Sequence, residues 1–228
     1  MDRSSWDRVA SLLEKRHKLV VVELPGHGAS VPLSKVSVTA VAAELDRTLR
    51  REKIKNPVLV GHSYGALVAL EEAAASGKVR GVVSIDLATY VDADSERIAN
   101  LVDLMDHRYP LFVRGVFSSM TRDSSQIDSL IAKAQRVPQP ILSEYFHDVW
   151  RTDLRPRIRT LKTPVLLVAT DQTWRTTETW ETARERLGYV TAGPVTGRRV
   201  FGSAHLVPMD QPDTLAAAIL EFTSTLKK

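Results

Sequence analysis

The stretch from Val58 to Leu67 constrains this chain more than any other. An apolar run leads directly into Gly61-His62-Ser63-Tyr64-Gly65, and an alanine-rich segment comes directly after it. This pattern predicts a buried strand, a sharp turn and a helix in succession. A Gly-x-Ser-x-Gly turn in that context is typical of a nucleophile elbow, in which strain on the backbone holds the serine hydroxyl exposed above a sheet. Ser63 is therefore the leading candidate for a reactive nucleophile.

The residues around this serine carry two further expectations. We expect side chains at positions 61 and 65 to collide with the neighbouring strand and helix, so that both positions require glycine. A helix that begins just after Ser63 leaves backbone N–H groups free near its start. The N–H of Tyr64 is the expected donor to a negatively charged oxygen that forms beside Ser63.

Apolar and amphipathic segments alternate along most of the chain. Strands are expected over 19–24, 58–60, 79–85, 165–169 and 199–201, and helices over 5–14, 38–49, 66–75, 177–187 and 212–226. Such alternation predicts an α/β fold with a mostly parallel sheet that is covered by helices on both faces. From about 91 to 157 only helical patterns occur, which indicates a helical insertion.

Two more segments accompany the serine turn. Leu24-Pro25-Gly26-His27-Gly28-Ala29-Ser30 comes after the first apolar run, and Gly202-Ser203-Ala204-His205-Leu206-Val207-Pro208 precedes the last helix. With these segments the sequence resembles the α/β-hydrolase superfamily across essentially its whole length, above all its esterase and lactonase-type members. The resemblance implies one α/β-hydrolase domain over 1–228, with a core of 1–90 and 158–228 and a helical lid over about 91–157. It also implies a serine hydrolase mechanism without a cofactor.

The resemblance assigns the remaining catalytic roles. A serine hydroxyl needs a base to become nucleophilic, and His205 is the histidine that lies between the last strand and the final helix. His27 and His62 are expected to shape turns beside the site. Some family members place the acid at the end of the sixth strand, where this chain has Asp86. Others place it after the seventh strand, where Thr173 takes the usual position and Asp171 lies two residues earlier. We favour Asp86 and keep Asp171 as the alternative.

Several other residues are expected to have structural roles, or to have either a structural or a functional role. Asp210 is expected to cap the final helix, with Pro212 in the first turn of that helix. The aromatic residues of the insertion could line a pocket for an acyl group or pack together in the core of the lid. They are Tyr109, Phe112, Phe117, Tyr145, Phe146 and Trp150.

The family resemblance also implies that sheet is missing at the start of the chain. Family members carry a strand that ends in a His-Gly loop, which supplies one oxyanion-hole N–H, and Ser4-Ser5-Trp6 resembles the residues just after that loop. Met1 is therefore expected to be an internal start, with a native minimal variant as the alternative. Without that strand, the strands over 19–24 and 58–60 would lack a partner. We expect such a chain to be marginally stable and a poor catalyst.

Composition narrows the possible functions. The 228 residues carry a net charge of +4 without a long basic run, which argues against nucleic-acid binding. No apolar run approaches the roughly 20 residues that span a bilayer. The absence of cysteine excludes disulfides and thiolate catalysis. The N-terminus is polar and not typical of a signal peptide.

The sequence therefore predicts a cytoplasmic monomer or homodimer. Its predicted activity is to cleave a small or medium, mostly apolar carboxylic ester through an acyl-enzyme. The alternatives are a C–C hydrolase or lyase on the same scaffold, an inactive truncated product, and a ligand-binding hydrolase relative.

Overall fold

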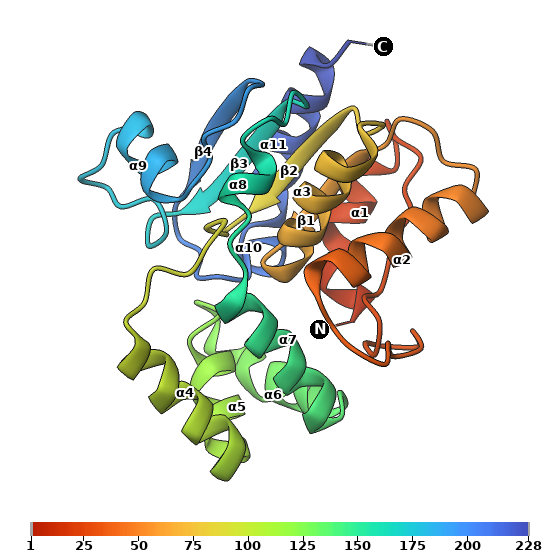
Figure 1. Cartoon of the computed structure of the whole chain (residues 1–228). Coiled ribbons are helices and arrows are strands. Elements are labelled where there is room, and N and C mark those ends of the chain that lie inside the picture. The colour runs from red at the N-terminus through yellow and green to blue at the C-terminus, as the bar shows by residue number, and fades with distance from the viewer. Residues whose placement is uncertain (1, 228) are drawn as a thin grey trace.

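A parallel sheet forms the centre of the molecule (Figure 1). The computed structural model describes residues 2–227, and Met1, the proposed internal start, lies outside them. Among the described residues the strands are β1 (Val58–His62), β2 (Gly81–Ile85), β3 (Val165–Thr170) and β4 (Val195–Val200), in the order β1-β2-β3-β4. Each neighbouring pair is parallel. The predicted α/β class is therefore confirmed.

The two inner strands are buried along their whole length, which explains why their sequences are continuously apolar. Their side chains alternate between two cores. Val82 and Leu167 point into one core, whereas Val83 and Val168 point into the other. Helices therefore cover both faces of the sheet.

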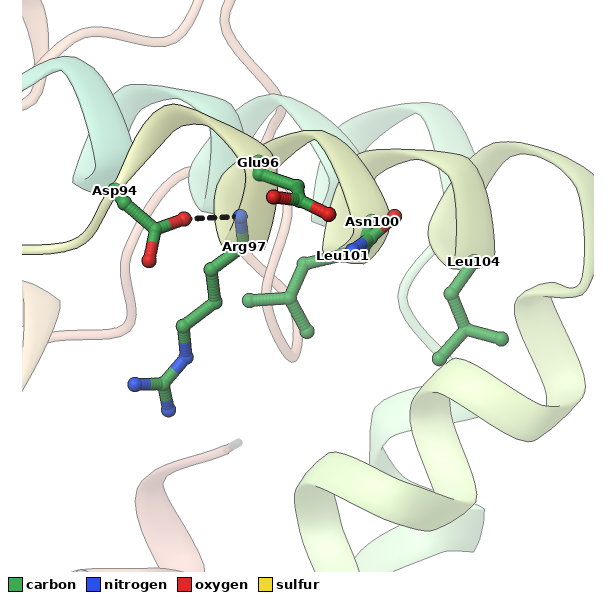
Figure 2. A pocket seen from close by; sticks show the side chains of 6 residues that line it. All are labelled: Asp94, Glu96, Arg97, Asn100, Leu101 and Leu104. Carbon is green, nitrogen blue, oxygen red and sulfur yellow. Dashed lines mark hydrogen bonds between the residues drawn. The ribbon is translucent and has the colours of Figure 1, made fainter.

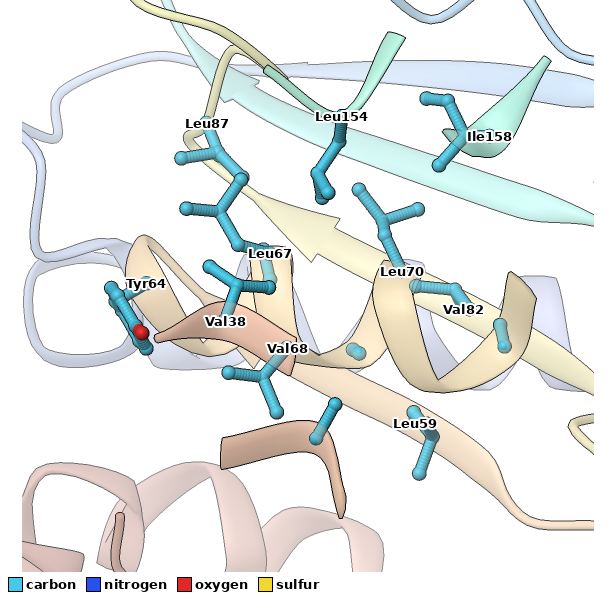
Figure 3. Close-up of a cluster of buried hydrophobic side chains, with 14 of the residues drawn as sticks. Val38, Leu59, Tyr64, Leu67, Val68, Leu70, Val82, Leu87, Leu154 and Ile158 are labelled. Atoms are coloured by element: carbon cyan, nitrogen blue, oxygen red, sulfur yellow. The ribbon is translucent and has the colours of Figure 1, made fainter. Parts of the chain in front are cut away.

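On one face lie α1 (Asp7–Leu13) and α11 (Pro212–Thr225), which contact one another. On the other lie α2 (Val38–Arg51), α3 (Tyr64–Ser76) and the short α8 (Arg155–Ile158), with α9 (Trp180–Arg186) beside them. Figure 3 shows the side chains of α3 between the sheet and the neighbouring segments. Helix α3 is apolar almost all round because neighbours surround it on nearly every side. This packing holds its first turn, beside Ser63, in a fixed place.

Between β2 and β3 the described chain forms helices. They are α4 (Ser95–His107), α5 (Tyr109–Ser118), α6 (Ile127–Gln135), α7 (Gln139–Arg151) and the short α8. A 3-10 turn, η2 (Ser124–Gln126), lies between α5 and α6, and another, η1 (Arg3–Trp6), precedes α1. We call residues 91–157 the lid segment. Its helices enclose a core of their own, in which the fully buried Phe112 packs edge-on against Phe146. Trp150 also contacts Phe112 edge-on.

The prediction of a strand over 19–24 is wrong. This segment forms neither helix nor strand, and Val20 and Val22 are 49% and 41% exposed. A strand requires a neighbour that exchanges backbone hydrogen bonds with it, and no segment within residues 2–227 does so here. For the same reason β1 lies at an edge of the sheet rather than in its middle.

The last strand also differs from its prediction. It begins at Val195, whereas the sequence predicted a start at 199. The prediction missed the first residues of the strand because they largely face solvent and carry no apolar pattern. Helix α9 is shorter than the predicted 177–187 helix and begins after Thr179, whose side chain accepts a hydrogen bond from the Thr182 N–H. Within residues 2–227, no helix combines the length and the apolar character that a membrane crossing needs.

Candidate active site

Ser63 lies where β1 ends and α3 begins. Its backbone has φ +52° and ψ −122°, a left-handed conformation that is costly for a residue with a side chain. The Ser63 N–H donates to the Ile85 carbonyl of β2 at 3.0 Å, and the Ser63 carbonyl accepts from the Ala66 N–H at 2.8 Å. The sheet and the helix therefore hold the strained turn from both sides.

The two glycines of the turn differ in whether the surrounding structure requires glycine. A Cβ atom at Gly61 would overlap the backbone of Gly65, so position 61 requires glycine, as the sequence predicted. At Gly65 the same expectation is wrong, because a Cβ there would have no described neighbour within 4 Å. Within this turn, the close approach of β1 to α3 therefore restricts position 61 and leaves position 65 open.

Asp86 and His205 meet directly. His205 Nδ1 donates to Asp86 Oδ2 at 2.8 Å, although the two residues are 119 positions apart. Asp86 comes directly after β2 with φ +50°, and its other carboxylate oxygen accepts from both the N–H and the hydroxyl of Thr170, each at 2.9 Å. The carboxylate side chain is only 3% exposed. Three donors thus hold a buried carboxylate at the Nδ1 edge of the imidazole.

This contact fixes the state of both groups. Burial raises the pKa of Asp86, but the hydrogen bond and charge of His205, together with the Thr170 N–H, outweigh it and hold that pKa below its ordinary value. An ionised carboxylate only accepts hydrogen bonds, so the proton of a neutral His205 ring lies on Nδ1. Its Nε2 is then free to accept a proton.

Asp171, the alternative acid, lies elsewhere. Its Oδ1 is 3.8 Å from a guanidinium nitrogen of Arg122, and no described group hydrogen-bonds this oxygen. Among residues 2–227 no hydrogen bond joins Asp171 to His205. The structure therefore brings Asp86 to His205 and leaves Asp171 apart.

Two further histidines, His62 and His27, are neutral at physiological pH. Desolvation, reinforced by the nearby His205 ring, lowers the pKa of His62 to about 3. Desolvation likewise lowers the pKa of His27 to about 4. His62 Nε2 lies 2.7 Å from the His205 carbonyl oxygen and donates to it, because a carbonyl only accepts. His62 thus holds the backbone of His205.

Tyr64 contributes to the site through its backbone and its side chain. Its N–H lies in the first turn of α3 and has no acceptor within residues 2–227, so it can donate to an anion. Its hydroxyl donates to Asp148 Oδ2 of α7 at 2.7 Å. Burial, and then Asp148, raise the pKa of this hydroxyl well above its usual value, so it stays protonated.

A cavity of about 210 Å³ opens beside these groups. Ser63, Asp86 and His205 all contribute to its wall. The rest of the lining is mainly apolar, with two polar side chains, and consists of Leu67, Leu87, Ala88, Tyr90, Val91, Val149 and Thr152. The six lid aromatics singled out in the sequence are absent from this lining and contribute to the packing of the lid segment or its contact with the core.

Comparison with known proteins agrees with this arrangement. The sequence model of the alpha/beta hydrolase family matches residues 1–218. The chain belongs to this family. A search of curated proteins found no match.

Solved structures similar to this α/β hydrolase include enzymes of several kinds. A bromoperoxidase from Bacillus anthracis has 15% identity and a TM-score of 0.85, with 98% of this chain and 88% of that chain covered. A thermophilic esterase from Thermogutta terrifontis has 18% identity and a TM-score of 0.81, with 98% and 86% covered. An enol-lactonase from Burkholderia xenovorans LB400 has 17% identity and a TM-score of 0.77, with 98% and 87% covered. At these identities the likeness shows the α/β-hydrolase fold alone.

A second hollow of this hydrolase, of about 430 Å³, lies along α4 of the lid segment (Figure 2). Its lining residues all come from α4 or the residue before it, and Asp94 caps that helix by accepting from the Arg97 N–H at 2.6 Å. No residue of the serine turn lines this hollow. It is therefore separate from the candidate site.

Two residues of the site were not predicted from the sequence. Thr170 ends β3, and a polar residue at the carboxyl end of a strand beside β2 was the available signal. Asp210 was predicted to cap the final helix, and this prediction is wrong. The residue before α11 is Gln211, which makes no side-chain capping bond, and the Asp210 carboxylate instead binds groups near His205.

Proposed function

We propose that this α/β hydrolase cleaves carboxylic esters through an acyl-enzyme formed on Ser63. The proposal rests on the residues that form the wall of one cavity. That wall includes both a serine on a strained turn and a histidine whose Nδ1 donates to a buried carboxylate. That combination supports nucleophilic catalysis, because the histidine can take the serine proton while the carboxylate orients the ring.

In the proposed reaction, Ser63 Oγ attacks the ester carbonyl carbon and its proton passes to His205 Nε2. The negative charge on the carbonyl oxygen is stabilised by the Tyr64 N–H at the start of α3. Asp86 stabilises the imidazolium without itself taking the proton. His205 then protonates the departing alcohol, and a water molecule, activated by the same histidine, hydrolyses the acyl-enzyme. Every step uses groups of this chain, and none requires a cofactor.

The cavity favours a small or medium, mostly apolar substrate. Its lining includes Leu67, Leu87, Val91 and Val149, and its volume is about 210 Å³. Apolar walls favour apolar substrate groups because burial removes their surface from water, at about 25 cal/mol per Å². Charged substrates would leave their charge unpaired against these walls. The expected partner is therefore a neutral small-molecule ester.

The experiment measures p-nitrophenyl butyrate hydrolysis and labelling by a fluorophosphonate. We expect the parent chain to show a burst and covalent labelling, and Ser63→Ala to lose both, with turnover reduced on the order of 10⁴-fold or more. Ser76→Ala is the matched control, because Ser76 ends the helix that Ser63 precedes and does not line the cavity. Its hydroxyl donates to the Glu72 carbonyl at 3.0 Å and accepts from the Lys78 N–H at 3.2 Å. Its activity should equal that of the parent.

Two results would contradict this proposal. Labelling of the parent without ester turnover would favour the C–C hydrolase or lyase alternative. Neither labelling nor turnover by a folded parent would favour a ligand-binding or inactive relative.

A further inference from the structure

The Asp210 side chain accepts hydrogen bonds from two separate segments of the chain. It ends α10 (Val207–Asp210), and its Oδ2 accepts from the Ala204 N–H at 2.8 Å. The buried Ser203 hydroxyl lies 3.3 Å from this oxygen and 2.7 Å from the Ala204 carbonyl, and it shares its one proton between them. Asp210 Oδ2 also accepts from the Arg122 N–H at 3.2 Å, and Oδ1 accepts from the Thr121 hydroxyl at 2.6 Å. One carboxylate therefore joins the loop before His205 to a turn of the lid segment.

The backbone on both sides of His205 is held as well. The N–H of Ala204 donates to Asp210, and the Leu206 N–H donates to the Met120 carbonyl at 2.8 Å. The His205 carbonyl itself accepts from His62. The core supplies one of these three partners, and the Asp210 carboxylate and the lid segment supply the others.

The arrangement points to a role in orienting the imidazole. The His205 ring must keep Nδ1 on Asp86 while Nε2 serves Ser63, and its direction depends on the backbone that carries it. Thr121 is only 8% exposed, so its hydroxyl is fixed against Asp210 rather than shared with bulk water. A shift of the lid turn would therefore reach the His205 loop through the Asp210 carboxylate on one side of His205 and through the Met120–Leu206 hydrogen bond on the other.

We propose that Asp210 is a positioning residue that sets the orientation of His205 and couples it to the lid turn of residues 120–122. This inference rests on the proposed function of Ser63 and His205. Asp210 touches neither Ser63 nor the cavity. It acts through the Ala204 peptide and through Thr121.

The test compares three variants of the full chain. Asp210→Asn keeps the size of the side chain but sets an amide NH2 group among N–H donors. Thr121→Val removes the hydroxyl that donates to Asp210 and accepts from the Asp123 N–H, and it leaves the Arg122 N–H bond to Asp210 in place. Asp213→Asn is the matched control, because Asp213 lies three residues on, in the first turn of α11, and makes an exposed ion pair with Arg8.

We expect Asp210→Asn to lower kcat for p-nitrophenyl butyrate about 10- to 100-fold with KM changed less than about twofold. Thr121→Val should lower kcat by a smaller factor, and Asp213→Asn should match the parent. If Asp210 has only a structural role, both lid-linked variants lower the melting temperature while kcat per folded molecule stays at the parent value. That result would overturn the inference.

A spectroscopic measurement separates this inference from the proposed function. The proton on His205 Nδ1, bound to Asp86, should give a downfield imidazole NMR signal, assigned by its loss in His205→Gln. We expect Asp210→Asn to shift or broaden this signal and Asp213→Asn to leave it in place. A parent without esterase activity whose signal responds in this way contradicts the proposed function and supports the positioning role. An unchanged signal in Asp210→Asn contradicts the positioning role whatever the activity.

Discussion

At the scale of single residues, the site is built where strands end. Ser63 comes directly after β1 and Asp86 directly after β2, and both have positive φ, at +52° and +50°. An aspartate tolerates this conformation better than most side chains, whereas a serine is held there only by its surroundings. Neighbouring parallel strands end at the same edge of the sheet, so two strained turns present their side chains to one place.

Two substitutions test whether Asp86 or Asp171 is the acid that orients His205. Asp86→Asn should lower turnover on the order of 10⁴-fold, because an asparagine at this position favours the wrong His205 tautomer. Asp171→Asn should stay close to the parent, since Asp171 faces Arg122 rather than His205. Steady-state kinetics of both variants on one ester make the comparison. A large loss confined to Asp171→Asn would reverse the assignment.

At the scale of elements, the lid helix α7 is attached to the elbow helix α3. Tyr64 donates to Asp148, and the Tyr64 ring packs edge-on against Tyr145 with centroids 4.6 Å apart. Tyr145 in turn donates to the Pro25 carbonyl at 2.8 Å. Val149, one residue beyond Asp148, lines the cavity. The cavity wall is therefore aligned with the serine turn through two tyrosines.

This attachment predicts a stability difference between two similar variants. Tyr64→Phe removes the donor to a partly buried Asp148 carboxylate and should lower the free energy of unfolding by roughly 1 to 3 kcal/mol. Tyr109→Phe is the control, because no described group hydrogen-bonds the buried Tyr109 hydroxyl. It should be neutral or slightly stabilising. Urea unfolding curves measure both, and equal losses would show that the Tyr64–Asp148 bond contributes nothing.

At the scale of the whole molecule, the β1 edge of the sheet, like the β4 edge, has no further strand partner within residues 2–227. β1 is an edge strand among the described residues, and the apolar segment 19–24 is not part of the sheet. Val20 is 49% exposed, and Val22 is 41% exposed. An uncovered strand edge together with exposed apolar side chains is a template for pairing with another chain.

We therefore expect the 228-residue chain to self-associate as its concentration rises. Val20→Lys should reduce the associated fraction, because a charge on this segment opposes pairing. Val190→Lys, at a position that is 51% exposed but distant in sequence from that segment, should have no effect. Sedimentation velocity over a range of concentrations measures the outcome. A parent that stays monomeric throughout, or equal effects of both lysines, would contradict this expectation.

The sequence by itself determined the local features of this hydrolase. The serine turn, the two buried strands beside it and the amphipathic helices result from apolar spacing and from the glycine at position 61, which depend only on residues close in the chain. The candidate nucleophile and base were also identifiable, because their surroundings match family motifs residue by residue.

Only the tertiary structure decided the features that depend on partners distant in the chain. The 19–24 segment has the composition of a strand but no neighbour to pair with, so composition could not make it one. Whether Asp86 or Asp171 meets His205 depends on how β2 and β3 end relative to a loop more than thirty residues later. Asp210 resembles a helix cap in the sequence, yet its carboxylate binds the lid turn and the His205 loop. Hydrogen bonds of this kind depend on how distant elements pack together, so the spacing of residues close in the sequence cannot predict them.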